Sequence, residues 1–165
     1  MPLYLALLRG INVSGKKIIK LEDLRIAMET SGYTNVKTYI QSGNIIFEST
    51  ISSNDTVAAS IEALIKEKYG FEISVFVLDK VDMQNAIDNN PFTEGRVEEE
   101  PGFKKLYVTF LSGMPADDKL EKLRQAPIGE DLIEVVDKVL YFKLASKASD
   151  SKLSNNLVEC LINKV

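Results

Sequence analysis

The run from Leu3 to Arg9 constrains the fold most, because its apolar residues fall at successive positions rather than at alternate ones. Side chains alternate between the two faces of a strand. One face would carry Leu3, Leu5 and Leu7, and the other would carry Tyr4, Ala6 and Leu8. Because neither face is polar, we expect a buried strand whose sheet is covered on both sides.

The residues that follow predict a defined order of helices and strands. Apolar residues recur at helical spacing in two segments and at strand spacing or in β-branched runs in the others. The predicted order is strand, helix, strand, strand, helix, strand, over Leu3–Arg9, 21–32, Val36–Gln41, Asn44–Glu48, 53–70 and Glu72–Leu78. This is the ferredoxin-like βαββαβ order. Asp79 and Asp82, three residues apart, predict the capped start of one more short helix, which ends before Pro91.

The second half predicts the same order again without its last strand. Strands are expected at Lys105–Leu111, Leu132–Val136 and Val139–Leu144, with helices around 120–126 and 153–165. The fold class is therefore α+β, with a ferredoxin-like βαββαβ unit followed by a second, incomplete βαββα unit packed against it. We assign residues 1–91 to the N-terminal half, 92–102 to a linker rich in Pro, Gly and Glu, and 103–165 to the second half. The two halves are expected to form one compact domain.

Composition excludes several chemistries. The chain has no histidine and one cysteine, so Ser-His-Asp triads, His-ligated zinc, thiolate metal clusters and dithiol redox reactions are ruled out. We expect no metal and no cofactor, and whether the protein is an enzyme stays open. No stretch reaches the ~18 consecutive apolar residues of a membrane span, and the N-terminus lacks the features of a signal peptide. We therefore expect a cytoplasmic protein without a membrane partner.

The loop Arg9–Lys17 is the most distinctive local feature. It contains G-x-x-x-x-G-K, the spacing by which glycines and a lysine hold phosphates. Lys17, however, stands where the hydroxyl that binds Mg²⁺ should be, and the next helix is expected only from Leu21. Residues 1–20 contain four basic residues and no acidic one, although the whole chain has a net charge of −4. A P-loop of an NTPase, a general anion-binding loop and a solvated connection are the alternatives.

A second polar cluster is Gln41-Ser42-Gly43-Asn44, at the predicted turn between the two middle strands. An ordinary turn explains it, because Gly and Asn tolerate left-handed backbone. It would belong to a binding site only if the turn meets the Arg9–Lys17 loop. On that hypothesis a phosphorylated or otherwise anionic small molecule would be bound by Arg9, Gly10, Asn12, Gly15, Lys16, Lys17, Gln41, Ser42 and Asn44.

Two other classes of function are alternatives. A βαββαβ sheet can bind RNA by stacking bases on aromatic residues, and Tyr4 and Phe47 are the candidates here. Nucleic acid is not expected, because the pI is about 5.0 and the basic patch is on a loop beside the sheet. A homodimer, or another protein interaction through a sheet face, is the remaining alternative.

The residues resemble a widespread bacterial family of unknown function. The similarity rests on Ala6–Val13 with Gly15-Lys16, on Thr38–Asn44 with Phe47, and more weakly on Asn90-Pro91-Phe92, Phe110-Leu111 and Ser151-Lys152-Leu153. The resemblance implies a small bacterial α+β protein and no established activity. It also implies a Thr-Arg-Asn-Trp-Asn-Thr-like segment near the C-terminus, which this chain lacks, so the chain is expected to be either a short member or one whose end is missing.

Overall fold

The computed structural model describes residues 1–40, 43–92, 106–146 and 151. The chain divides into two compact units, Met1–Asn85 and Ala86–Val165. Each unit contains one antiparallel sheet with helices. This confirms the α+β class and the ferredoxin-like order of elements.

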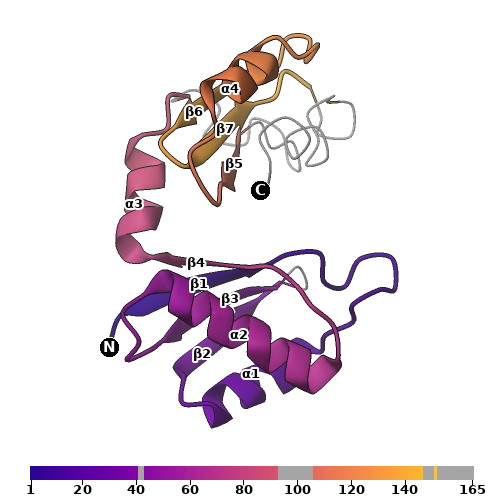
Figure 1. The fold of residues 1–165 in the computed structure, drawn as a ribbon, viewed down its shortest axis with the longest axis vertical. Coiled ribbons are helices and arrows are strands. Elements are labelled where there is room, and N and C mark those ends of the chain that lie inside the picture. Colours follow the sequence, from indigo (N-terminus) through magenta and orange to yellow (C-terminus); the bar gives the residue numbers. More distant parts are fainter. Residues whose placement is uncertain (41–42, 93–105, 147–150, 152–165) are drawn as a thin grey trace. The chain divides into compact units, whose positions relative to one another are not determined.

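The first unit is a four-stranded sheet with two helices (Figure 1). Its elements are β1 (Leu3–Leu8), α1 (Leu21–Thr30), β2 (Thr34–Tyr39), β3 (Asn44–Glu48), α2 (Asn54–Tyr69) and β4 (Val75–Asp79). The strand order is β2-β3-β1-β4, and every neighbouring pair is antiparallel. In the register of β1, Leu5 faces Ile46 of β3 on one side and Leu78 of β4 on the other.

Helices α1 and α2 cover one face of this sheet. The core beneath them includes Tyr4 and Phe47, which are 3% and 0% exposed, together with Leu24 of α1 and Ile61 of α2. The Tyr4 hydroxyl also donates to the Ile51 carbonyl at 2.8 Å. The two aromatic rings are therefore core residues, and they are not available to stack bases as the nucleic-acid alternative required.

The opposite face of the sheet, which α1 and α2 do not cover, is partly exposed. Leu3 is 49% exposed and Ile46 is 40% exposed, whereas Leu5 and Leu7 are half-buried. Both faces of β1 are apolar in the sequence, and α1 and α2 cover only one of them.

The ends of the helices follow the capping residues in the sequence. The Ser53 hydroxyl accepts from the Thr56 N–H at the start of α2, and Gly70 ends this helix with φ 76°. Helix α3 (Lys80–Asp88) begins after a reciprocal cap, in which Asp79 and Asp82 each accept the other's backbone N–H at 2.8 and 3.0 Å. The capping role predicted for Asp79 is confirmed.

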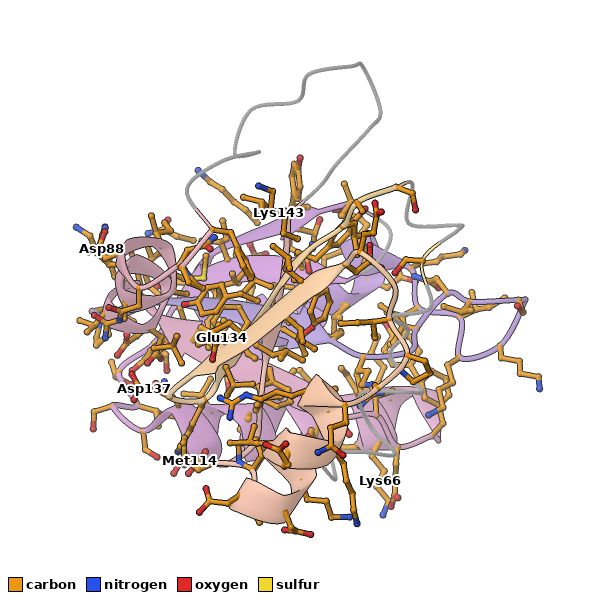
Figure 2. All side chains as sticks on the ribbon, turned by 90° about the horizontal axis from the view of Figure 1, so that it is seen from above. Lys66, Asp88, Met114, Glu134, Asp137 and Lys143 are labelled. Carbon is orange, nitrogen blue, oxygen red and sulfur yellow. The ribbon has the colours of Figure 1, made fainter. Side chains whose placement is uncertain are left out.

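The second unit repeats the topology of the first three strands. Its described elements are β5 (Leu106–Phe110), α4 (Asp117–Arg124), β6 (Leu132–Val136) and β7 (Val139–Lys143). The order β5-β7-β6 matches β1-β3-β2, with the later hairpin strand again in the middle. Asp137, labelled in Figure 2, forms the predicted hairpin turn with φ 53°.

Some expectations lie outside the described residues. These are most of the 92–102 linker and the final helix over 153–165. The domain boundaries at 91 and 103 therefore stay predictions. Strand β2 differs in detail, because it begins at Thr34 rather than Val36 and shifts register after that residue, where Asn35 has φ 52°.

Candidate functional site

The loop after β1 is a small β-hairpin rather than an irregular connection. Val13 and Lys16 form an antiparallel bridge, with the Lys16 N–H donating to the Val13 carbonyl at 3.0 Å. Ser14 and Gly15 make the turn with φ 51° and 71°, as a tight hairpin turn of this hand requires. This segment, called the β1–α1 hairpin below, extends beyond the end of the sheet (Figure 1).

This geometry rules out a P-loop. In a P-loop, successive backbone N–H groups converge on the phosphates and the helix begins at the Gly-Lys step. Here the N–H groups of Asn12 and Lys16 donate within the hairpin, to Lys17 and Val13. Helix α1 begins only at Leu21. The NTPase alternative is therefore wrong.

Asn12 fastens the hairpin to the chain that leads into α1. Its Oδ1 accepts from the Ile19 N–H at 2.9 Å, and its Nδ2 donates to the Ile19 carbonyl at 3.1 Å. Asn12 also has φ 56°, a conformation that asparagine tolerates better than most residues. Both ends of the amide are thus used inside the protein, and Ile19 is 1% exposed.

Lys17 holds the other side of the hairpin. Its Nζ donates to the Glu72 carbonyl at 2.7 Å, and the Glu72 carboxylate pairs with Lys66 Nζ, also at 2.7 Å. The Lys66 ammonium lowers the pKa of the Glu72 carboxyl, with a smaller effect from Lys17. Lys66, labelled in Figure 2, comes from the last turn of α2, so two distant segments bring lysines to this end of the unit.

Lys16 is different, because its side chain is exposed at the hairpin. Its neighbours Ser14 and Gly15 are exposed as well. Five residues between 10 and 17 have positive φ, namely Gly10, Asn12, Ser14, Gly15 and Lys17. A backbone held in sparsely populated conformations is common at binding sites, where the surrounding contacts fix it.

The second polar cluster meets the hairpin through Gly43. The Leu8 N–H donates to the Gly43 carbonyl at 2.9 Å, and a Cβ on Gly43 would lie 2.6 Å from Ile11 Cδ1. Asn44 follows in β3, opposite Leu7. The structure therefore brings Arg9–Lys17 and 43–44 to the same end of the sheet, while Gln41 and Ser42 lie outside the described residues.

Several participants were not predicted from the sequence. Ile11 provides the contact with Gly43, and Lys66 and Glu72 hold the far side of the hairpin. The Ser14-Gly15 pair is a turn signal that could have predicted the hairpin. No local signal in the sequence points to Lys66 or Glu72, because their contact with Lys17 is tertiary.

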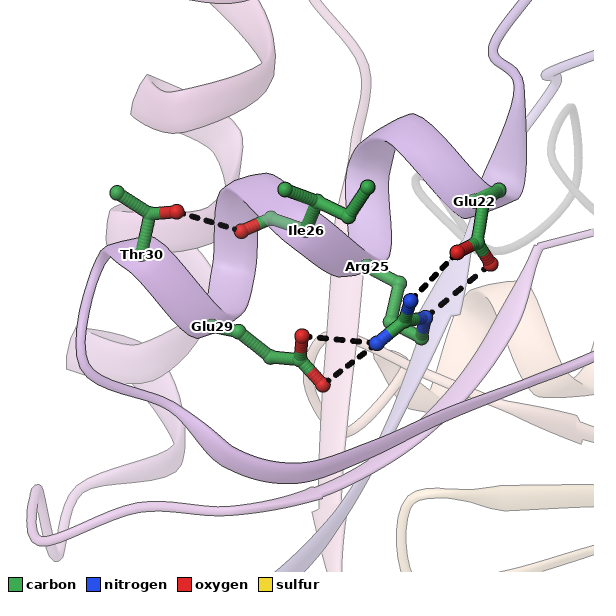
Figure 3. A network of polar contacts seen from close by, with 5 residues as sticks. All are labelled: Glu22, Arg25, Ile26, Glu29 and Thr30. Atoms are coloured by element: carbon green, nitrogen blue, oxygen red, sulfur yellow. Dashed lines mark hydrogen bonds and ion pairs between the residues drawn. The ribbon is translucent and has the colours of Figure 1, made fainter.

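Arg25 forms the densest charged cluster of α1, and it is structural. Its guanidinium is held by Glu22 and Glu29, and the Thr30 hydroxyl donates to the Ile26 carbonyl in the same helix (Figure 3). The bond from Arg25 lowers the pKa of the Glu22 carboxyl. Because these charges pair along one exposed helix, they contribute little to stability and leave Arg25 occupied.

The described residues contain neither a cluster of metal ligands nor a membrane-spanning helix. No group of three or more His, Cys, Asp or Glu side chains in this part of the chain could hold a metal ion. None of the helices described is both long and apolar enough to span a membrane.

Comparison with known proteins identifies a family but no activity. The model of a family described as "Protein of unknown function (DUF1697)" matches residues 1–141. The solved structure of conserved bacterial protein SP0830 from Streptococcus pneumoniae is similar, with a TM-score of 0.70 and 23% identity over 97% of this chain and 82% of that chain. No curated protein matches the sequence. The structural likeness supports the fold and assigns no ligand.

Proposed function

The chain belongs to the DUF1697 family of proteins of unknown function, and we propose that it binds a phosphorylated small ligand where the β1–α1 hairpin meets the turn before β3. The observation that carries the proposal is the contact of Gly43 with Leu8 and Ile11. This contact joins two polar segments that are about 30 residues apart in the sequence. A cytoplasmic location, as expected from the sequence, is part of the proposal.

The hairpin suits this role because it is held on both sides. Asn12 bonds the backbone of Ile19, and Lys17 bonds the backbone of Glu72. A ligand then meets a preformed loop, and less conformational entropy is lost on binding. Asn12 and Lys17 accordingly act as positioning residues in this proposal, rather than as the direct ligand contacts that the sequence suggested.

Lys16 would supply the principal charge. It follows the exposed turn of Ser14 and Gly15, which carries backbone N–H groups. Lys66 adds positive potential at this end of the unit, and its ion pair with Glu72 partly balances that charge. Ammonium groups form charge-assisted hydrogen bonds with phosphate oxygens, which are about twice as strong as neutral ones. Arg9, at the base of the hairpin, would add a guanidinium whose planar fork suits a phosphate.

Thermal unfolding of the full chain with a panel of ligands tests the proposal. The panel contains nucleotides, sugar phosphates and polyphosphate, and the variants are Lys16→Ala and Lys80→Ala. Lys80 is an exposed lysine that follows β4 at the opposite end of the same sheet. A ligand at a hundred times its Kd adds about 2.7 kcal/mol, or about 5–10 °C for a protein of this size. Such a shift in wild type and Lys80→Ala, and its loss in Lys16→Ala, supports the site. A panel without any shift contradicts it.

A second candidate function is protein interaction through the face of the first sheet opposite α1 and α2. The exposure of Leu3 and Ile46 on that face favours it. A self-association that buries this face would appear as a dimer in sedimentation analysis, and Ile46→Lys would then return the protein to the monomer. The ligand panel and the sedimentation experiment are independent, so either function can fail alone.

A further inference from the structure

One row of residues crosses the face of the first sheet opposite α1 and α2, at the end that carries the β1–α1 hairpin. Tyr39 of β2 is paired with Asn44 of β3, and Asn44 is paired with Leu7 of β1. Residues paired across strands share a face, so Tyr39, Asn44 and Leu7 all point to the side opposite α1 and α2. Tyr39 and Leu7 are about two strand spacings apart, roughly 9.5 Å.

Arg9 belongs to the same face. The β1–β4 ladder continues one residue beyond the strand, because the Arg9 N–H donates to the Ser74 carbonyl at 3.0 Å. Arg9 is two residues beyond Leu7, and positions two apart in a strand point to the same side. Asn44 is then the diagonal neighbour of Arg9, about 7–8 Å away between Cα atoms. A guanidinium, an amide and a phenol ring thus follow one another across this end of the sheet.

Tyr39 is the most exposed aromatic side chain among the described residues. It is 66% exposed, whereas Tyr4 and Tyr33 of the same unit are 3% and 4% exposed. A ring on an edge strand that is left in water stabilises the fold little, and a single exposed ring would need no explanation. Its position beside Asn44, at the end of the sheet where Arg9 and Lys16 supply positive charge, indicates a role in binding the ligand.

We infer that the ligand of this site is a nucleotide, with its phosphates at Arg9 and Lys16 and its base stacked on Tyr39. This inference rests on the proposed function and names its ligand class. An aromatic ring stacks on the planar face of any base, and cations bind the phosphates. Asn44, between them, faces the sugar or the edge of the base.

Isothermal titration calorimetry on the full chain tests the inference with ATP, GTP, CTP, UTP and inorganic triphosphate. The variants are Tyr39→Leu, Tyr39→Phe and Lys16→Ala. Wild type should bind at least one nucleotide about tenfold more tightly than triphosphate. Tyr39→Leu should bind the nucleotide about tenfold more weakly and bind triphosphate as wild type does. Tyr39→Phe should keep the wild-type affinity for the nucleotide. Lys16→Ala should weaken the binding of both ligands.

The outcomes separate the inference from the proposed function. If triphosphate binds as tightly as every nucleotide, or if Tyr39→Leu weakens both ligands equally, the stacking role of Tyr39 is overturned while the phosphate site stands. If no nucleotide binds, the inference is overturned, and the sugar phosphates and polyphosphate of the panel above still decide the proposed function. A five-nucleotide RNA that binds more tightly than the mononucleotides, with the same loss in Tyr39→Leu, supports the inference and identifies a strand as the source of the nucleotide.

Discussion

Gly43 touches Ile11 so closely that a Cβ on this glycine would lie 2.6 Å from Ile11 Cδ1 and 2.9 Å from Leu8 Cβ. Gly43 also has φ 86°, which L side chains rarely adopt. The contact is therefore available only to glycine, and it is the point at which the turn before β3 and the β1–α1 hairpin are joined.

Gly43→Ala should destabilise the protein more than left-handed strain alone can explain. Gly32 is the matched control, because it has φ 97° and nothing within 4 Å of its Cβ position. Gly32→Ala should cost about 1–2 kcal/mol from the backbone conformation. Gly43→Ala should cost a further 1–3 kcal/mol, roughly, from overpacking against Ile11. Urea unfolding measures both, and equal losses would mean that Ile11 moves aside without cost.

Asn12 gives a second test of how the hairpin is held. Asn12→Gly keeps the positive φ accessible but removes both bonds to the Ile19 backbone, and Asn12→Ala removes the bonds and adds strain. The loss of these bonds should cost about 1–3 kcal/mol, because the buried Ile19 N–H and carbonyl are left without partners. Hydrogen exchange of the Ile19 amide should accelerate in both variants, while the β1 amides stay protected. Unchanged exchange at Ile19 would show that Asn12 does not fasten the hairpin.

The order of the elements could be predicted from the sequence because local signals mark it. Periodicity located the strands, Ser53 and Gly70 marked the ends of α2, and the Asp79–Asp82 spacing marked the start of α3. These signals act over a few residues. They agree with the tertiary structure, which is the condition under which reasoning from sequence succeeds.

The site could be predicted only in part, because its contacts are between residues distant in sequence. The basic loop and the 41–44 turn were identified by composition, but the bonds of Lys17 to Glu72 and the contact of Gly43 with Ile11 depend on the packing of β1, β3 and β4. The bonds of Asn12 to the Ile19 backbone and of Lys17 to the Glu72 carbonyl could not be predicted for the same reason. A polar residue in a loop satisfies the backbone or binds a ligand, and only the fold decides between these uses.

Glu72 should titrate below the ordinary range for glutamate. The ion pair with Lys66 stabilises its carboxylate, so the folded pKa lies below the unfolded one. The small stabilisation is complete above the unfolded pKa and is lost as the pH falls through the lowered folded pKa. Carboxyl NMR should show Lys66→Met raising the pKa of Glu72 more than Lys17→Met does. The reverse order would mean that Lys17, rather than Lys66, dominates the electrostatics beside the hairpin.

Among the described residues of the second unit, Asp131 should be the polar position most sensitive to substitution. It is 6% exposed, and its carboxylate accepts from the Ala145 N–H at 2.8 Å and from the Ser151 hydroxyl at 2.6 Å. Asp131→Ala removes both acceptors and should cost about 2–4 kcal/mol, since hydrogen bonds to charged groups are worth about 1.5–3 kcal/mol each. Asp131→Asn keeps an oxygen for Ala145 and can donate to Ser151, so it should cost less. Thermal unfolding of the two variants and of Ser151→Ala compares these losses. Equal effects of Ala and Asn would mean that the negative charge, rather than the acceptor geometry, is what matters.

Residues 1–91 should fold without the rest of the chain. The buried residues of the first core fall between Tyr4 and Val77, so the proposed N-terminal half contains every member of that cluster. Its sheet is also complete, with β2-β3-β1-β4 in the ferredoxin-like order. A fragment of residues 1–91 should therefore unfold cooperatively in urea, with coincident transitions by circular dichroism and by tyrosine fluorescence. Because Ile46 is 40% exposed on the face opposite α1 and α2, Ile46→Lys should improve the solubility of the fragment without changing the midpoint by much. A broad transition without cooperativity would place the boundary of the folding unit elsewhere and would show that the first core needs residues beyond 91.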